Sequence, residues 1–368
     1  MSTFLERHTE LISRLTVSDT PGSIPDLGYS ICDDRGYLVD VLKPIIDDRD
    51  AIKAQIREET QQDHPNEDRL AELEGRSDAL KWILVACFGY QGFSNAKFGR
   101  IECHEAINAF AREILLSAKQ RLEAGGWRVV HGIVDSTWVI PEPDTDPEDR
   151  TSLETLASEI TDSVGIRLEY EAAYDWVAFV PQRDSDAGAL TKYFGKLEGR
   201  DDFKLRGVEA RQRSTPPFVE TVQRECLDCF AATRDPEVVI DRLGEAIAQL
   251  HAGHVDALDL VETVRVSKPL EAYTQTTRTV AALERADTLG VATYPGQSIE
   301  YVVVDDTKSS QDRVALAHED PESYDPSYYE TQLVRAVESL LSPLGWNRTQ
   351  IRRVLDDHDT TELTAFTE

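Results

Sequence analysis

The chain is poor in sulfur and has no long apolar run. Five cysteines and one methionine occur among its 368 residues. An odd number of cysteines forms no convincing disulfide framework, and the single Cys-x-x-Cys pair, Cys226 and Cys229, is interpreted as part of a helix rather than as a zinc site. No stretch approaches the roughly 18 apolar residues of a membrane-spanning helix, and the first residues lack signal-peptide character. These absences predict a cytoplasmic protein without a membrane partner.

Several common catalytic signatures are also absent. The sequence has no Gly-x-Ser-x-Gly nucleophile elbow, no P-loop and no dinucleotide fingerprint, which excludes the enzyme classes that these motifs define. His251 and His254 have helical spacing, but Gly253 between them and the lack of a nearby third ligand favour a solvated helix end over a metal site.

Basic residues are scarce relative to acids. Lysine and arginine number 39 against 68 aspartates and glutamates, which gives a net charge of −29, and only ten of the bases are lysine. A DNA-binding surface is expected to be basic, so this charge taken alone fits a protein that never meets nucleic acid. Acids spread along the whole chain, with arginine in preference to lysine, are also typical of a halophilic protein. In molar salt the Debye length is about 3 Å, so an acidic surface repels DNA little beyond contact distance.

One predicted hairpin carries an acid at its tip. Residues 131–136, His-Gly-Ile-Val-Asp-Ser, lie between strand-like runs at 127–130 and 137–140. A carboxylate on such a turn can reach a bound metal without being buried, which suits phosphoryl transfer assisted by metal ions. Asp and Gly are also common in hairpin turns for backbone reasons, so a bare turn is the alternative. The neighbouring segments favour the metal-binding interpretation, with Asp135 as the acid.

Three cations precede the hairpin in two helix-like segments. Arg49 and Lys53 are four residues apart and share one face of a helix, and Lys81 lies in the apolar run of the next. If the two helices pack antiparallel, as the short polar connection at 61–68 permits, the three cations converge on one polyanion. This is the charge that a triphosphate needs. The alternative is a solvated helix face with routine ion pairs.

The order of these segments resembles the C-terminal half of family-B DNA polymerases. Asp47–Lys53 resembles the first fingers helix, Leu80–Gly89 resembles the second, which carries motif B, and His131–Ser136 occupies the place of motif C. The resemblance implies that Asp135 is the catalytic acid and the ligand of Mg²⁺ or Mn²⁺. The dNTP-binding residues that it implies are Arg49, Lys53 and Lys81.

Later segments continue the resemblance to about residue 352. Leu190–Gly195 is similar to the lysine-tyrosine motif that tracks the primer-template duplex, and Arg206–Arg211 follows it where the palm meets the thumb. Ser267–Tyr273 is similar to a thumb segment in the same order. The residues that this implies for binding primer-template DNA are Lys192, Tyr193, Arg211 and Lys268.

The sequence also departs from the family pattern. At motif B, Val85 and Ala86 stand where the family usually has Asn and Ser, and Phe88 replaces Tyr. At motif C, Ile133 replaces the first Asp, whereas Asp135 matches the second, which is the metal ligand. This pattern resembles the archaeal branch of family B whose active-site motifs are degenerate.

Motif A, which supplies the other metal-binding Asp of the family, is missing. Its expected place is residues 3–12, where no Asp occurs. Asp33, Asp34 and Asp40 are candidate substitutes, and the sequence gives no reason to choose among them. A second polypeptide that carries motif A, together with the missing N-terminal and exonuclease domains, is the other possible source. One ligand cannot clamp both the attacking and the leaving oxygen.

The predicted fold class is α+β. The resemblance implies a ferredoxin-like antiparallel palm sheet, a helical fingers hairpin and a mostly helical thumb. The predicted parts are a segment leading into the palm at 1–42, fingers at 43–98, palm at 99–215, and thumb with an acidic tail at 216–368. Within the palm, residues 101–124 form a long amphipathic helix, and residues 167–170 and 176–180 form a pair of strands.

Two functions are compatible with these observations. The first is template-directed DNA synthesis in replication or repair, weak or dependent on a partner that supplies motif A. The second is a catalytically inactive DNA-binding or scaffolding subunit of a replication or repair complex. Metal-dependent chemistry at Asp135 distinguishes them.

Overall fold

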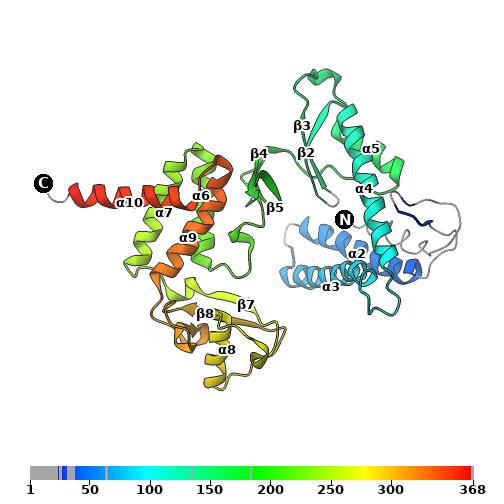
Figure 1. The fold of residues 1–368 in the computed structure, drawn as a ribbon. Coiled ribbons are helices and arrows are strands. Elements are labelled where there is room, and N and C mark those ends of the chain that lie inside the picture. The colour runs from blue at the N-terminus through cyan, green and yellow to red at the C-terminus, as the bar shows by residue number, and fades with distance from the viewer. Residues whose placement is uncertain are drawn as a thin grey trace. The chain divides into compact units, whose positions relative to one another are not determined.

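The computed structural model of the protein describes residues 24, 27–30, 38–62, 65–133, 136–182 and 185–365. The chain divides into two compact units, Met1–Glu171 and Ala172–Glu368, which Figure 1 colours from blue to green and from green to red. This division falls inside the segment 99–215 that the sequence predicts as palm, so the domain boundaries given above stay predictions.

The first unit combines long helices with one hairpin. Its helices are α2 (Leu38–Thr60), α3 (Glu67–Gln91), α4 (Ile101–Ala124) and α5 (Leu153–Val164), and its strands are β2 (Trp127–Ile133) and β3 (Ser136–Pro141). The bounds of α4 match the predicted amphipathic helix. The antiparallel pairing of β2 with β3 confirms the predicted hairpin.

Helices α2 and α3 form an antiparallel pair, referred to below as the fingers hairpin. Leu42 and Ile46, early in α2, are buried against Leu84, late in α3. At the other end, the Oε1 atom of Glu59 accepts a hydrogen bond from the backbone N–H of Asn66 at 3.0 Å. The side chain of Asn66 then caps α3 by accepting from a backbone N–H of its first turn. The short polar connection thus brings the two helices together as the sequence predicts.

Helix α4 connects two small cores of the first unit. Near its beginning, Ala106 and Ile107 pack with Ile24 of the chain that precedes the fingers hairpin. Near its end, Leu122 packs with Leu156 of α5 and with the inner side of the β2–β3 hairpin. A helix with one apolar stripe buries that stripe against whatever covers it, so α4 fixes the hairpin relative to the fingers side of the unit.

The second unit contains two three-stranded antiparallel sheets and a set of helices. One sheet has the order β4 (Tyr174–Gln182), β5 (Ser185–Leu197), β6 (Phe203–Arg206), and the other has the order β7 (Glu262–Arg265), β8 (Ser298–Val303), β9 (Val314–Leu316). The helices are α6 (Pro217–Thr233), α7 (Pro236–His251), α8 (Arg278–Thr288), α9 (Pro326–Leu341) and α10 (Arg348–Ala365). The sequence predicts that this part of the chain is mostly helical, but it does not predict the second sheet.

The predicted strand pair of 167–170 with 176–180 is wrong. Strand β4 contains the second segment, but its partner is β5, and residues 167–170 form no strand. The longer strand β5 pairs with both β4 and β6, so it satisfies more backbone groups than a four-residue partner would. Local alternation of apolar and polar residues does not identify which strand will be the partner.

One continuous core joins the sheets and helices of the second unit. Phe194 of β5 is fully buried, and its ring lies 5.6 Å from the ring of Phe230 in α6. Trp176 of β4 packs on both rings, and the guanidinium of Arg234 covers Trp176 at 4.0 Å from the ring centroid. Aromatic and cation–π contacts of this kind each contribute on the order of 1 kcal/mol. They fix the sheet β4–β5–β6 against α6.

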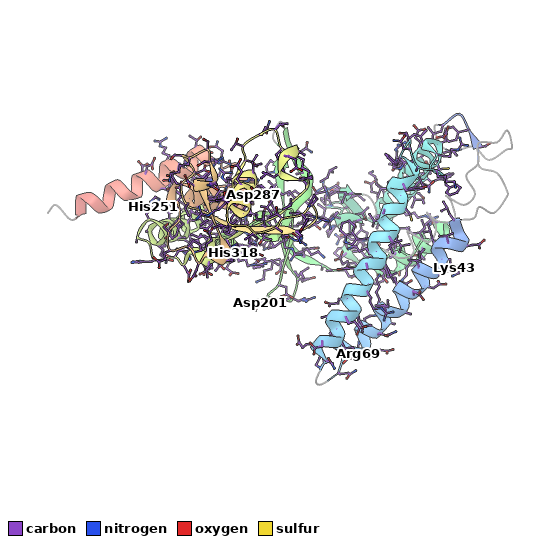
Figure 2. The ribbon with its side chains drawn as sticks, turned by 90° about the horizontal axis from the view of Figure 1, so that it is seen from below. Lys43, Arg69, Asp201, His251, Asp287 and His318 are labelled. Atoms are coloured by element: carbon purple, nitrogen blue, oxygen red, sulfur yellow. The ribbon has the colours of Figure 1, made fainter. Side chains whose placement is uncertain are left out.

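Charged side chains cover the outside of both units, as Figure 2 shows for Lys43, Arg69 and Asp201. Lys43 pairs with Asp47 one helical turn away, at 2.9 Å, and Arg69 pairs with Glu59 at 3.4 Å. Exposed pairs contribute only about 0–1 kcal/mol each, and less in high salt. Within the described residues, no helix combines the length and the apolar character that crossing a membrane requires.

Candidate nucleotide and nucleic-acid interface

The β2–β3 hairpin carries the motif-C segment. Its strands pair up to Ile133 opposite Ser136, and the ring of His131 packs edge-on against Trp138 with centroids 5.0 Å apart. Asp135, the predicted catalytic and metal-binding residue, lies outside the described residues. The structure therefore confirms the hairpin, and the role of the acid stays a prediction.

The three predicted triphosphate ligands all lie on the fingers hairpin. Arg49 is only 6% exposed, and its Nε donates to the backbone carbonyl of Ser77 on α3 at 3.2 Å. Lys53 lies one turn beyond Arg49 on α2, and Lys81 lies one turn beyond Ser77 on α3. Residues four apart share a helix face, so the half-buried lysines follow the same seam between the helices. Because the helices are antiparallel, Lys53 and Lys81 lie on opposite sides of the contact between Arg49 and Ser77, and the convergence of the three cations on one polyanion stays a prediction.

This seam contains a buried donor and two neighbouring cations. The Nη1 group of Arg49 is buried and has no hydrogen-bond partner among the described residues. Burial lowers the pKa of the Lys53 ammonium, and the nearby charge of Arg49 lowers it further. A buried donor without a partner is costly, and two adjacent cations repel each other. An anionic ligand that reaches the seam would relieve both effects.

Lys192 has two partners inside the second unit. Its Nζ donates to Oε1 of Glu209 at 3.1 Å and to Oγ of Ser339 at 2.6 Å. Glu209 is 5% exposed, and its Oε2 accepts from Nε2 of Gln223 at 3.1 Å. These bonds join β5, the 3₁₀ turn η2 (Glu209–Arg211), α6 and α9. Lys192 therefore has a structural role that the sequence does not reveal, and its contact with DNA stays a prediction.

The turn before Glu209 explains how the acid reaches Lys192. Gly207 has a φ of +69°, and a Cβ at this position would lie 2.3 Å from the backbone carbonyl oxygen of Thr191. Only glycine fits such a turn without strain. The only local indication of this contact in the sequence is Arg-Gly-Val-Glu at 206–209. In this segment, a glycine that permits close approach of two backbone segments precedes the acid by two residues.

Tyr193 is buried rather than presented at the surface. It is 4% exposed, and its ring centroid lies 5.5 Å from that of Phe179 on the neighbouring strand β4. A side chain packed in this way supports the sheet, and a contact of Tyr193 with DNA stays a prediction.

Arg211 and Lys268 are more accessible. Arg211 ends η2 with an exposed side chain. Lys268 is half-buried, and its Nζ lies 4.7 Å from the ring centroid of Tyr273. The Tyr273 hydroxyl accepts from the backbone N–H of Ser267 at 3.3 Å, and the hydrogen bond with the Ser267 side chain lowers the pKa of the tyrosine. This local loop holds the Lys268 ammonium over an aromatic face.

Within the described residues, no group of three or more His, Cys, Asp or Glu side chains is arranged to hold a metal ion. Cys226 is buried in α6, and burial raises its pKa to about 12, which agrees with the helical interpretation of the Cys-x-x-Cys pair. His251, labelled in Figure 2, is the last residue of α7, and its Nε2 lies 2.8 Å from Oε2 of Glu330. Its predicted place at a helix end is confirmed.

Comparison with known proteins decides the family. The model of DNA polymerase family B matches residues 17–344. The chain belongs to this family. The resemblance of the sequence to family-B DNA polymerases is thereby confirmed.

Several archaeal polymerases are similar to this family-B chain. The DNA polymerase of Thermococcus sp. (strain 9oN-7) is 26% identical over 336 residues, and that of Thermococcus gorgonarius is 25% identical over 341 residues. In both comparisons the match covers 89% of this chain and 42% of the relative. DNA polymerase 2 of Saccharolobus solfataricus is 33% identical over 152 residues, which cover 41% of this chain and 22% of that protein. The chain thus spans less than half of the length of these relatives.

A solved structure supports the same fold. The family B DNA polymerase of Pyrobaculum calidifontis superimposes with a TM-score of 0.53 at 20% identity, over 91% of this chain and 44% of that one. The α+β fold class is confirmed, with antiparallel sheets and a large helical content.

The motif-B departures of this family-B chain lie on the second half of α3. Val85 and Ala86 are exposed there, so the helix offers aliphatic groups where polar ones are usual. Phe88 packs against His104 of α4 with ring centroids 4.3 Å apart. The Phe88 ring thus contributes to the packing of α3 against α4. This packing does not require the hydroxyl group of the tyrosine that the family usually has at this position.

Proposed function

We propose that this chain takes part in template-directed nucleotidyl transfer on primer-template DNA, in replication or repair. The observation that carries the proposal is the buried Arg49, whose Nη1 group has no partner among the described residues. Lys53 and Lys81 lie one helical turn from Arg49 and from Ser77, and in this proposal a dNTP triphosphate supplies the missing acceptors. Membership of a polymerase family supports this choice of anion over others.

Members of the family use divalent metal ions, and Asp135 would hold Mg²⁺, or Mn²⁺ in its place. Such an ion neutralises phosphate charge and lowers the pKa of an attacking hydroxyl. One ligand cannot clamp both the attacking and the leaving oxygen, so in this proposal a second carboxylate joins Asp135. Asp40, exposed in the first turn of α2, is one candidate, and Asp33 and Asp34 lie outside the described residues.

A second polypeptide is the other proposed source of that carboxylate. This chain spans 42% of the length of its Thermococcus relatives, and the proposed partner would carry a segment with motif A. In this form of the proposal, the chain alone extends primers weakly, and the partner with motif A raises the rate.

A catalytically inactive DNA-binding or scaffolding subunit is the second candidate. The observation that favours it is Ile133, which occupies the last paired position of β2, where the family carries the first acid of motif C. An aliphatic residue there cannot bind a cation. In this case the chain keeps duplex binding and recruits other proteins.

Primer extension in molar KCl, with Mg²⁺ and then Mn²⁺, tests the proposed function directly. Duplex binding measured on the same preparation separates the two candidates. Extension establishes a polymerase, whereas tight duplex binding without extension, even with added partner fractions that carry motif A, supports the scaffolding subunit.

The variant Lys81→Ala is expected to weaken dNTP binding by roughly 10- to 100-fold, because a charge-assisted contact contributes about 1.5–3 kcal/mol. Equilibrium titration with a fluorescent dNTP and Mg²⁺ measures the affinity. Lys97→Ala is the matched control, because Lys97 is exposed beyond the end of α3 and lies 5.3 Å from the ring of Phe98. Equal dNTP affinities for the two variants would remove Lys81 from the nucleotide site.

The variant Lys268→Ala is expected to weaken duplex binding and to lower its salt dependence by the equivalent of about one phosphate contact, near 0.9 in the slope of log K against log salt. Fluorescence anisotropy over a series of KCl concentrations measures the slope. Lys308→Ala serves as control, because Lys308 pairs with Asp305 at 3.5 Å on another loop of the same unit. Identical slopes for parent and Lys268→Ala would contradict the assignment.

A further inference from the structure

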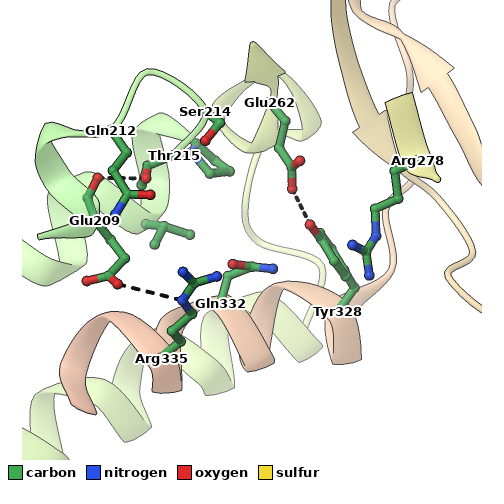
Figure 3. A pocket seen from close by; sticks show the side chains of 11 residues that line it. Glu209, Gln212, Ser214, Thr215, Glu262, Arg278, Tyr328, Gln332 and Arg335 are labelled. Atoms are coloured by element: carbon green, nitrogen blue, oxygen red, sulfur yellow. Dashed lines mark hydrogen bonds and ion pairs between the residues drawn. The ribbon is translucent and has the colours of Figure 1, made fainter. Parts of the chain in front are cut away.

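A polar pocket of about 190 Å³ lies within the second unit, between the loop that follows η2 and helix α9 (Figure 3). Glu262 of β7 and Arg278 of α8 complete its walls. None of the predicted triphosphate or duplex ligands lines it. The pocket is therefore separate from the residues predicted to bind the triphosphate and the duplex.

The carboxylate oxygens in the pocket wall are already occupied. Glu209 and Glu262 are both buried, and each of their four side-chain oxygens accepts a hydrogen bond from a neighbouring donor. The donors are Lys192 and Gln223 for Glu209, and Tyr301 and Tyr328 for Glu262. Burial also raises the pKa of Glu262, which disfavours its negative charge. The wall thus has few acceptors left to offer a ligand.

Donors in the pocket wall, in contrast, keep N–H and O–H groups that form no hydrogen bond among the described residues. Arg335 is 53% exposed along its side chain, and its Nε forms a long ion pair with Oε1 of Glu209 at 3.6 Å, which leaves the Nη groups without a hydrogen bond among the described residues. Gln332, one turn earlier on α9, and Ser214 on the facing loop form no side-chain hydrogen bond among the described residues. Arg278 uses Nε and Nη2 on Asp306 at 2.8 Å each and keeps Nη1 free of such bonds. Figure 3 shows Gln332 and Arg335 rising from α9 toward the centre of the pocket.

We propose that this pocket binds one phosphate group through Arg335, Gln332 and Ser214. A wall with occupied acceptors and uncommitted donors complements a ligand that is rich in acceptors and anionic, and guanidinium groups match phosphate geometry. The volume is below the roughly 300–1,000 Å³ of pockets that enclose a whole small molecule, so a single phosphate fits better than a nucleotide.

Two sources can supply this chemistry. One is a phosphodiester of the bound DNA strand, and this source rests on the proposed function. The other is a free ion, either inorganic phosphate or the pyrophosphate that nucleotidyl transfer releases. The pocket has the same donors for both, so the experiment must distinguish them.

Isothermal titration calorimetry measures the affinity of the full chain for free ions. The titrants are inorganic phosphate and pyrophosphate, at constant ionic strength. Anisotropy with duplex DNA over a KCl series measures the affinity for the DNA backbone. Arg335→Gln is expected to weaken whichever ligand the pocket binds by about tenfold or more, and Gln332→Leu by less, because the lost contact is uncharged. Arg348→Gln, which removes an exposed arginine paired with Glu338 outside the pocket, is the matched control. Thermal melting confirms that each variant is folded.

Loss of free-ion binding in Arg335→Gln, with an unchanged salt slope for DNA, supports the site and identifies the free ion as its ligand. A slope reduced by about 0.9 supports the site and identifies the DNA backbone. If the chain binds no duplex at all, the proposed function fails while the titration with free ions still tests the pocket. Phosphate affinity and salt slope that are both equal to those of the parent in Arg335→Gln would overturn the proposal.

Discussion

Asp135→Ala is expected to reduce primer extension by roughly a thousandfold or more. A metal ligand contributes several kcal/mol of transition-state stabilisation, and each 1.4 kcal/mol corresponds to about a factor of ten in rate. Asp135→Asn, which keeps the shape and removes the charge, is expected to be nearly as inactive. Because Asp135 is assigned to the metal and not to the DNA backbone, duplex affinity should change little in either variant.

Asp144→Ala is the control for this experiment, because Asp144 is exposed in the loop that follows β3 and has no predicted role. It should extend primers like the parent. Extension by Asp135→Ala at the parental rate would show that another carboxylate holds the metal, and the assignment of Asp135 would be wrong. If the parent protein binds duplex DNA but extends no primer, either alone or with a partner that carries motif A, the scaffolding function is supported instead.

Local features of the fold are predictable from this sequence. Helix α4 has one apolar stripe over 101–124 and coincides with the predicted helix, and the β2–β3 hairpin forms between the two predicted runs. The fingers hairpin forms because its connection is short and both helices have apolar faces near the open end, at Leu42 and Leu84. In each case the information lies within a few turns of the chain, where periodicity and turn residues decide the structure.

Contacts between distant segments are not predictable in this way. The partner of β4 is β5 and not the preceding segment, because pairing depends on strand length and on both neighbours of β5. The partner of Lys192 on α9, Ser339, is 147 residues away. The sequence identifies the lysine by its motif but contains no local signal for the serine that holds it.

The same limit applies to the candidate site. Motif order predicts that Arg49, Lys53 and Lys81 share a hairpin, which they do, but not that Arg49 is buried and bonded to the carbonyl of Ser77. Burial of a cation depends on how closely two helices approach, and helix periodicity does not specify that distance. Experiments therefore have to distinguish the role of Arg49 in joining α2 to α3 from its proposed contact with a triphosphate.

Glu209→Ala is expected to destabilise the protein by about 3 kcal/mol, because removing one partner of a buried ion pair leaves the other without compensation. Lys192, 27% exposed along its side chain, would keep only Ser339, and Gln223 would lose one acceptor. For a unit of this size the melting temperature should fall by roughly 6–12 °C. Glu220→Ala, which removes an exposed i,i+4 pair with Arg224, should change stability by no more than about 0.5 kcal/mol.

A double-mutant cycle then shows whether Lys192 is held by Glu209 in solution. Lys192→Met and Glu209→Gln, each alone and combined, are expected to give a coupling energy of about 1–3 kcal/mol in chemical denaturation. The coupling should persist in molar KCl, because salt screens a buried pair much less than a surface pair. A coupling near zero would mean that the Lys192 ammonium is free to reach DNA. A large coupling would mean that Lys192 holds β5, η2 and α9 together. Any loss of duplex affinity in Lys192→Ala would then come from this structural change and not from a lost phosphate contact. In that case the salt slope of Lys192→Ala should match that of the parent.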